Sequence, residues 1–181
     1  FVQRLDSRSL GRPRVEEGIF MIRKPSFMRW EYRKPEEKLA VADGEHTWLY
    51  LPEEREVHKG RAADLQRSGA AALLLAGRLR LDRDFEARLS EGDSAGADPP
   101  STGTQVLELR PLAPDTEFER VLLTVEIPGL SIRRLVLVDA LGDRMSFDLS
   151  AIEENPDLSD DLFSFRPPPG VRVIETAPPQ P

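Results

Sequence analysis

The residues of this chain with the most obvious spacing for covalent chemistry are Gly92-Asp93-Ser94-Ala95-Gly96. They match the Gly-x-Ser-x-Gly nucleophile elbow of serine hydrolases, which needs a tight strand-to-helix turn and an acid and a histidine later in the chain. Here the serine lies in a stretch rich in glycine and proline, and both histidines, His46 and His58, precede it. The spacing therefore indicates a polar loop and no nucleophile.

The sequence also lacks side chains in the patterns that bind metals or cofactors. The chain has no cysteine, and its two histidines stand apart without the spacing of a zinc-binding helix. Acidic pairs such as Glu36-Glu37 and Glu53-Glu54 flank prolines, where carboxylates are solvated. A glycine-rich phosphate loop is absent from the sequence as well. We therefore expect no catalytic residues, no metal site and no cofactor.

Composition narrows the function further. The 181 residues are enough for one domain, and no apolar run approaches the ~20 residues that cross a bilayer. The net charge is −7, with an excess of three positive charges over residues 1–90 and of ten negative charges over residues 91–181. An acidic chain with interspersed basic residues is a poor binder of nucleic acid. Six of the sixteen prolines lie in the last fifteen residues, which predicts an extended tail.

The positions that carry apolar side chains predict a mainly β fold. Met28, Trp30 and Tyr32 alternate with polar residues, and Trp48 and Tyr50 do the same after an Asp43-Gly44 hairpin signal. Similar alternation continues to residue 149, which gives nine or ten antiparallel strands. A sheet of that size must curl or split. Residues 61–81 interrupt the pattern with an Ala/Leu-rich stretch that predicts a helix or two short helices, including Leu73, Leu74 and Leu75.

Two ordered sets of motifs resemble a known family. Residues 17–32 read Glu-Gly-Ile-Phe-Met-Ile-Arg-Lys-Pro-Ser-Phe-Met-Arg-Trp-Glu-Tyr, and Asp43-Gly44 and Trp48-Leu49-Tyr50-Leu51-Pro52 follow in order. Near the other end, residues 163–171 read Phe-Ser-Phe-Arg-Pro-Pro-Pro-Gly-Val. Both resemble the periplasmic outer-membrane lipoprotein carrier family (LolA), strongly over residues 16–59 and again over 163–173.

The resemblance implies a half-open, strongly curved antiparallel β-barrel covered by short helices that form a lid. It also implies a monomeric periplasmic carrier that shields the acyl chains of lipoproteins between an inner-membrane ABC transporter and an outer-membrane receptor. We expect one such domain over residues 1–175 and a proline-rich tail over 176–181. The abrupt start at Phe1-Val2-Gln3 further suggests that a family helix and a removed signal peptide precede it.

Site residues follow from the same resemblance. The expected lipid-binding cavity wall consists of Met28, Trp30, Tyr32, Trp48 and Tyr50, with Leu73, Leu74 and Leu75 on the inner face of the lid. Ordinary core packing is the alternative role for both sets. Lys24 aligns with a family arginine that latches the lid, and a lysine lacks the planar fork of an arginine. Either Lys24 is a looser latch, or Arg23 replaces it, or Lys24 is a plain surface residue.

Other functions remain open at this point. The chain could be the outer-membrane lipoprotein acceptor, which is lipidated through an N-terminal cysteine, or another lipid-binding relative of the same fold. It could also be a periplasmic lipid-sensing domain that binds a partner protein. The cargo, whether lipoprotein, glycolipid or phospholipid, does not follow from the sequence.

Overall fold

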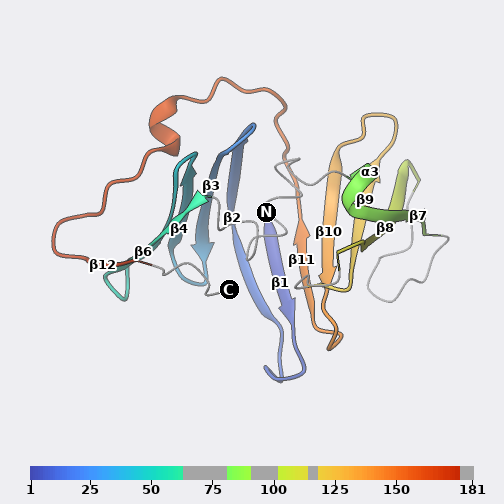
Figure 1. Cartoon of the computed structure of the whole chain (residues 1–181), viewed down its shortest axis with the longest axis horizontal. Coiled ribbons are helices and arrows are strands. Elements are labelled where there is room, and N and C mark those ends of the chain that lie inside the picture. The colour runs from blue at the N-terminus through green and yellow to red at the C-terminus, as the bar shows by residue number, and fades with distance from the viewer. Residues whose placement is uncertain (63–80, 91–101, 114–117, 176–181) are drawn as a thin grey trace. The chain divides into compact units, whose positions relative to one another are not determined.

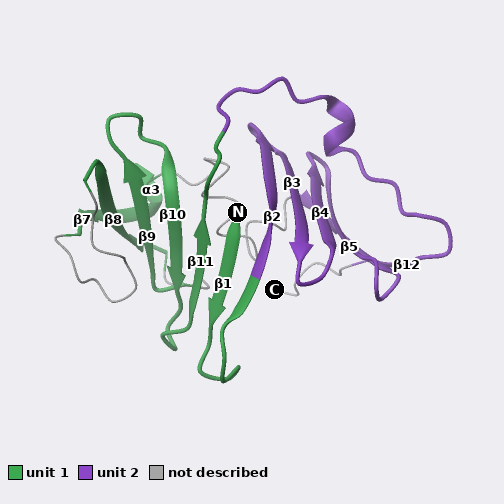
Figure 2. Ribbon diagram, turned by 180° about the vertical axis from the view of Figure 1, so that it is seen from behind, with its two compact units in different colours: residues 1–15, 79–152 green, residues 16–78, 153–181 purple. Residues whose placement is uncertain are grey.

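The computed structural model describes residues 1–62, 81–90, 102–113 and 118–175 (Figure 1). The chain divides into two compact units (Figure 2). Unit 1 contains residues 1–15 and 79–152, and unit 2 contains residues 16–78 and 153–181. β-strands make up most of the described residues, and each unit is built on six of them.

The strands of unit 1 are paired antiparallel. In spatial order they are β1 (Val2–Asp6), β11 (Arg144–Asp148), β10 (Ile132–Val138), β9 (Arg120–Glu126), β8 (Thr104–Pro111) and β7 (Phe85–Leu89). The short helix α3 (Leu81–Asp84) leads directly into β7. β7 is an edge strand, so the sheet is open on that side.

The core of unit 1 lies around β9, where Val121, Leu122 and Leu123 are consecutive and all buried. Neighbouring side chains of a strand point to opposite faces, so both faces of the sheet are covered at this strand. Leu122 lies opposite Val136 of β10, and Leu123 lies opposite Leu135. This burial explains why the run carries only branched aliphatic residues.

Unit 2 holds the other six strands. In spatial order they are β2 (Arg14–Arg23), whose first two residues belong to unit 1, β3 (Phe27–Lys34), β4 (Lys38–Asp43), β5 (His46–Leu51), β6 (Glu56–Arg61) and β12 (Arg172–Glu175). The pairs from β2 to β6 are antiparallel, and β12 adds to β6 in parallel as the edge strand. A 3-10 helix, η2 (Asp160–Phe163), lies in the segment that leads to β12.

The mainly β, open antiparallel fold expected from the sequence is confirmed. The predicted hairpin joins β4 to β5, with Gly44 at a φ of +94° that suits glycine. Nine or ten strands was too few, since the described residues contain twelve. The expected helix over 61–81, with Leu73, Leu74 and Leu75, falls mostly on residues 63–80, which lie outside the described residues, as does the tail over 176–181.

The last described residues, up to Glu175, are attached to unit 2, whereas the tail expected over 176–181 stays a prediction. The Arg172 N–H donates to the carbonyl of Arg55 at 2.9 Å, and the Arg172 side chain pairs with Glu56. Residues 172–175 then pair with residues 56–59 of β6. These backbone bonds make the segment after the prolines an edge strand of unit 2.

Candidate functional site

One face of the unit 2 sheet is apolar and centred on Trp30. Trp30 lies opposite Phe20 of β2 and Ala40 of β4, and Met28 lies opposite Ile22 and Ala42. The rings of Phe20 and Trp30 are 4.1 Å apart, and those of Trp30 and Tyr32 are 6.4 Å apart. We call this surface the Trp30 face; it comprises Phe20, Ile22, Met28, Trp30, Tyr32, Ala40 and Ala42.

Burial on the Trp30 face is deepest near its centre. Met28 is 2% exposed and Trp30 is 8% exposed. The two residues of β4 on this face, Ala40 and Ala42, are small and lie opposite the large side chains of Trp30 and Met28. The apolar surface continues to β5, where Leu49 lies opposite Ala40 and is partly exposed. An apolar strip therefore crosses β2 to β5 on this side.

A buried ion pair bounds the Trp30 face on one side. Lys38 lies opposite Tyr32, its ammonium is 5.4 Å from the centre of the Tyr32 ring, and it pairs with Glu16. Glu16 is buried, so the Lys38 ammonium replaces part of the charge stabilisation that water would give its carboxylate. The pair marks where the apolar strip ends.

Trp48 and Tyr50 lie on the opposite face of the sheet. Trp48 pairs with Val41, which pairs with Arg29, whereas Trp30 and Met28 point the other way. Tyr50 is two residues after Trp48 in β5, so both side chains lie on the same face. The five residues expected to line one cavity wall therefore form two separate sets, and one concave surface can contain only one of them.

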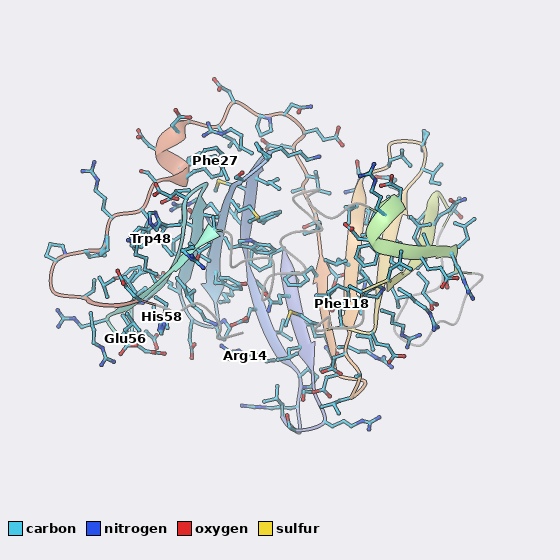
Figure 3. The ribbon with its side chains drawn as sticks, in the orientation of Figure 1. Arg14, Phe27, Trp48, Glu56, His58 and Phe118 are labelled. Atoms are coloured by element: carbon cyan, nitrogen blue, oxygen red, sulfur yellow. The ribbon has the colours of Figure 1, made fainter. Side chains whose placement is uncertain are left out.

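We call this second surface the Trp48 face; it comprises Phe27, Arg29, Val41, Trp48 and Tyr50. The C-terminal segment, residues 160–175, runs along it (Figure 3). The ring of Phe165 is 5.7 Å from Trp48 and 5.8 Å from Tyr50. Phe163 is 1% exposed and its ring is 5.8 Å from Phe27. The sequence motif Phe163-Ser164-Phe165 thus has a structural role, because both aromatic rings pack on the Trp48 face.

Polar contacts fix the two ends of the same segment. Arg29 donates from Nη1 to the carbonyl of Leu162 at 3.0 Å and from Nε to Glu31 at 2.6 Å. The guanidinium of Arg55 donates to the carbonyl of Gly170 at 3.3 Å. Arg29 was not among the expected site residues. One indication of its position was present in the sequence: Arg29 is next to Trp30 in the same strand, so its side chain lies on the opposite face of the sheet.

Similarity to known proteins agrees with this architecture. The model of the family described as "Outer membrane lipoprotein carrier protein LolA" matches residues 1–166. The chain belongs to this family. The outer-membrane lipoprotein carrier proteins of Dechloromonas aromatica and Nitrosomonas europaea are 33% and 34% identical to it over 174 residues, which covers 96% of this chain and 78% and 80% of theirs. The crystal structure of an uncharacterized conserved protein from Thermus thermophilus shares the fold at a TM-score of 0.54 and 13% identity, with 97% of this chain and 88% of that chain covered.

The two latch candidates suggested by the LolA resemblance differ in their surroundings. Lys24 is exposed in the turn between β2 and β3. Arg23 pairs with Asp160, and its guanidinium carbon lies 4.6 Å from the ring centre of Phe27 and 4.9 Å from that of Phe163. Arg23 therefore contacts η2 of the C-terminal segment. A contact of either residue with a lid stays a prediction, because residues 63–80 lie outside the described residues.

Asp43 organises the hairpin beside Trp48. Its carboxylate accepts the N–H groups of Glu45 at 2.9 Å and His46 at 2.7 Å, and the indole N–H of Trp48 at 2.9 Å. Partial burial acts to raise the pKa of Asp43, but these three hydrogen bonds and the nearby His46 together lower the pKa below its ordinary value. The charged carboxylate thus fixes the Trp48 side chain beside the turn that joins β4 to β5.

The remaining chemical candidates do not come together in the part of the chain that the structure describes. His46 shares a face with Trp48, whereas His58 lies opposite Leu49 on the other face. Among the described residues no group of three potential ligands could hold a metal ion. Ser94 of the elbow-like sequence is outside these residues. The helices that can be described are all too short or too polar to cross a membrane.

We predict that Asp43→Asn lowers the free energy of unfolding by about 1 kcal/mol at pH 7. Because the pKa of Asp43 is lowered in the folded state, its contribution is complete above the unfolded pKa of about 4 and disappears as the pH falls through the folded value. Urea unfolding at several pH values should show the difference between the two proteins shrinking as the pH falls below about 4. The exposed Asp157→Asn is the matched control and should match the parent at every pH; a gap for D43N that is constant with pH would contradict the prediction.

We predict that Arg23→Gln loosens the C-terminal segment and that Lys24→Gln does not. The Arg23 variant loses an ion pair to an exposed carboxylate and two cation–π contacts, together worth about 1 kcal/mol. Amide hydrogen exchange over residues 158–166 should become about fivefold faster. Lys24→Gln removes the same charge one residue away, so equal exchange in both variants would contradict this assignment.

Proposed function

We propose that this LolA-family chain is a periplasmic, non-enzymatic carrier that shields the acyl chains of lipoproteins on the Trp30 face. Support comes from the family, whose similar members are named outer-membrane lipoprotein carrier proteins. Each acyl CH₂ exposed to water costs about 0.8 kcal/mol, so three long chains need an apolar host to move between membranes. Its partners would be the inner-membrane ABC transporter and the outer-membrane receptor that the resemblance to the LolA family implies.

The Trp30 face carries this proposal because the other side of the sheet is already occupied. Phe163 and Phe165 of the chain itself pack on the Trp48 face and occupy part of the surface that Trp48 and Tyr50 would offer to a ligand. The Trp30 face offers aromatic, aliphatic and small side chains without a charged group at its centre. Met28 adds a flexible thioether that adapts to hydrocarbon of varied shape.

Access to the Trp30 face needs a cover that moves. Met28 and Trp30 are buried in this structure, so acyl chains would have to exchange with whatever packs on them. We propose that the segment with Leu73, Leu74 and Leu75 is that cover, and that it acts as the lid of the family. A cover of low local stability would let cargo in without a large barrier.

The two tryptophans of the chain allow a direct test, because they lie on opposite faces. Trp48→Phe leaves Trp30 as the only fluorescent indole, and Trp30→Phe leaves Trp48. A synthetic triacylated lipopeptide with brominated acyl chains should quench Trp30, since bromine quenches indoles at contact range. It should leave Trp48 unchanged, because the sheet and the C-terminal segment separate Trp48 from the chains.

Several results would argue against the Trp30 face. Equal quenching of both tryptophans would mean that the acyl chains do not select one side of the sheet. Quenching of Trp48 alone would place them under the C-terminal segment. The unbrominated lipopeptide is the control for changes in fluorescence that arise from motion of the protein. Absence of quenching in both variants, with lipopeptide in excess, would reject the carrier function itself.

A further inference from the structure

Two loops meet at one end of the unit 1 sheet, far along the chain from each other. They are the β1–β2 loop, residues 7–13, and the β10–β11 turn, residues 139–143 (Figures 1 and 2). Ser7 donates its hydroxyl to Asp143, and the N–H of Arg8 donates to the same carboxylate at 3.1 Å. These bonds lower the pKa of Asp143 and join the two loops into one structure.

Each loop presents a leucine to solvent. Leu141 is 74% exposed and Leu10 is 47% exposed. The β10–β11 turn closes internally, since Asp139 accepts the N–H groups of Leu141 at 2.8 Å and Asp143 at 2.9 Å. Asp139 thus accepts backbone N–H groups of its own turn, and Asp143 accepts groups of the β1–β2 loop, so two negative charges lie at the base of the turn while Leu141 is exposed.

Three arginines lie near Leu10 in the sequence, and one of them, Arg8, lies beside the turn that carries Leu141. Residues 7–14 include Arg8, Arg12 and Arg14 and no acidic residue, in a chain whose net charge is −7. All three arginines are exposed, and Figure 3 labels Arg14 at this end of β2. The guanidinium of Arg8 lies 3.7 Å from the position of a Cβ on Gly142, which places it beside Leu141. We call this end of unit 1 the basic tip; it comprises Arg8, Leu10, Arg12, Arg14 and Leu141.

We propose that the basic tip docks on the surface of a bilayer that contains anionic phospholipids. Arginines near such a surface are each worth about fivefold in affinity, and exposed leucines between them can enter the interfacial layer. The leucines stand on two protruding turns, and a deformable lipid surface accepts a convex apolar tip more readily than a preformed protein pocket does. The inference goes beyond acyl carriage, because none of these residues belongs to the Trp30 face.

The net negative charge of the chain makes binding to an anionic membrane dependent on a local basic site. A protein with a net charge of −7 is repelled by an anionic membrane unless a local basic region overcomes that repulsion. Binding of this chain to anionic vesicles therefore requires a defined site. At the other end of the unit 1 sheet, the β9–β10 turn also presents an exposed leucine, Leu130, but beside the Glu126–Arg133 ion pair. That turn serves as a natural comparison.

The experiment is co-sedimentation of the cargo-free chain with vesicles of phosphatidylglycerol and phosphatidylcholine in equal parts. We expect binding that falls as the ionic strength rises to about 1 M, and no binding to phosphatidylcholine alone. Arg8→Gln/Arg12→Gln should bind about 30-fold more weakly, at about fivefold per arginine. Leu141→Ser should bind about tenfold more weakly, since most of one leucine no longer leaves water.

Matched variants control for charge and for exposed apolar surface. Arg88→Gln/Arg110→Gln changes the net charge equally on exposed arginines of β7 and β8, and Leu130→Ser removes an equally exposed leucine; both should bind like the parent. The proposal is overturned if the parent chain does not sediment with the anionic vesicles, or if test and control variants lose affinity equally. Because no acyl cargo is present, this result is independent of the brominated-lipopeptide experiment.

Discussion

The alternation of side chains along β3 and β5 is the constraint on which the proposed site depends. A strand places successive side chains on opposite faces, so the pairings of Trp30 with Ala40 and of Trp48 with Val41 put the two tryptophans on opposite sides of the sheet. A shift of one residue in either strand would exchange its two sets of side chains. The register therefore decides which aromatic residues can meet a ligand and which form the core.

The C-terminal segment gives these two faces different roles. Burial of Phe163 contributes about 2 kcal/mol, whereas ion pairs with exposed partners, such as Arg23 with Asp160, contribute less than about 1 kcal/mol each. Aromatic packing thus supplies most of the attachment, and the arginines set its position. β12 completes it by covering the open edge of β6, which would otherwise present unpaired backbone groups. The chain itself therefore packs on one face of the sheet, and the opposite face is the one proposed to hold acyl chains.

Much of this fold could be predicted from the sequence, because its signals are local. Alternation located β3 and β5, and Asp43-Gly44 located the hairpin between β4 and β5. The division of the aromatic residues between two faces required the strand pairings, which depend on contacts between separate strands. β12 was missed because prolines precede it, and its pairing with β6 joins residues more than one hundred positions apart in the chain. The role of Arg23 depended likewise on η2, which no local pattern brings near β2.

The proposed carrier must also release its cargo, and the burial of the Trp30 face bears on that requirement. If Met28 and Trp30 were exposed to water without cargo, acyl chains would gain the full free energy of covering them, at about 25 cal/mol for each Å². Because both side chains are already covered, cargo gains only the difference between its own packing and that of the cover. The remaining free energy of binding comes chiefly from removal of the acyl chains from water. On release, the proposed cover packs on Met28 and Trp30 again, and this packing offsets part of the free energy lost when the acyl chains leave. For the proposed carrier, an apolar face that is already covered before cargo arrives therefore suits transfer between two membranes better than an open one.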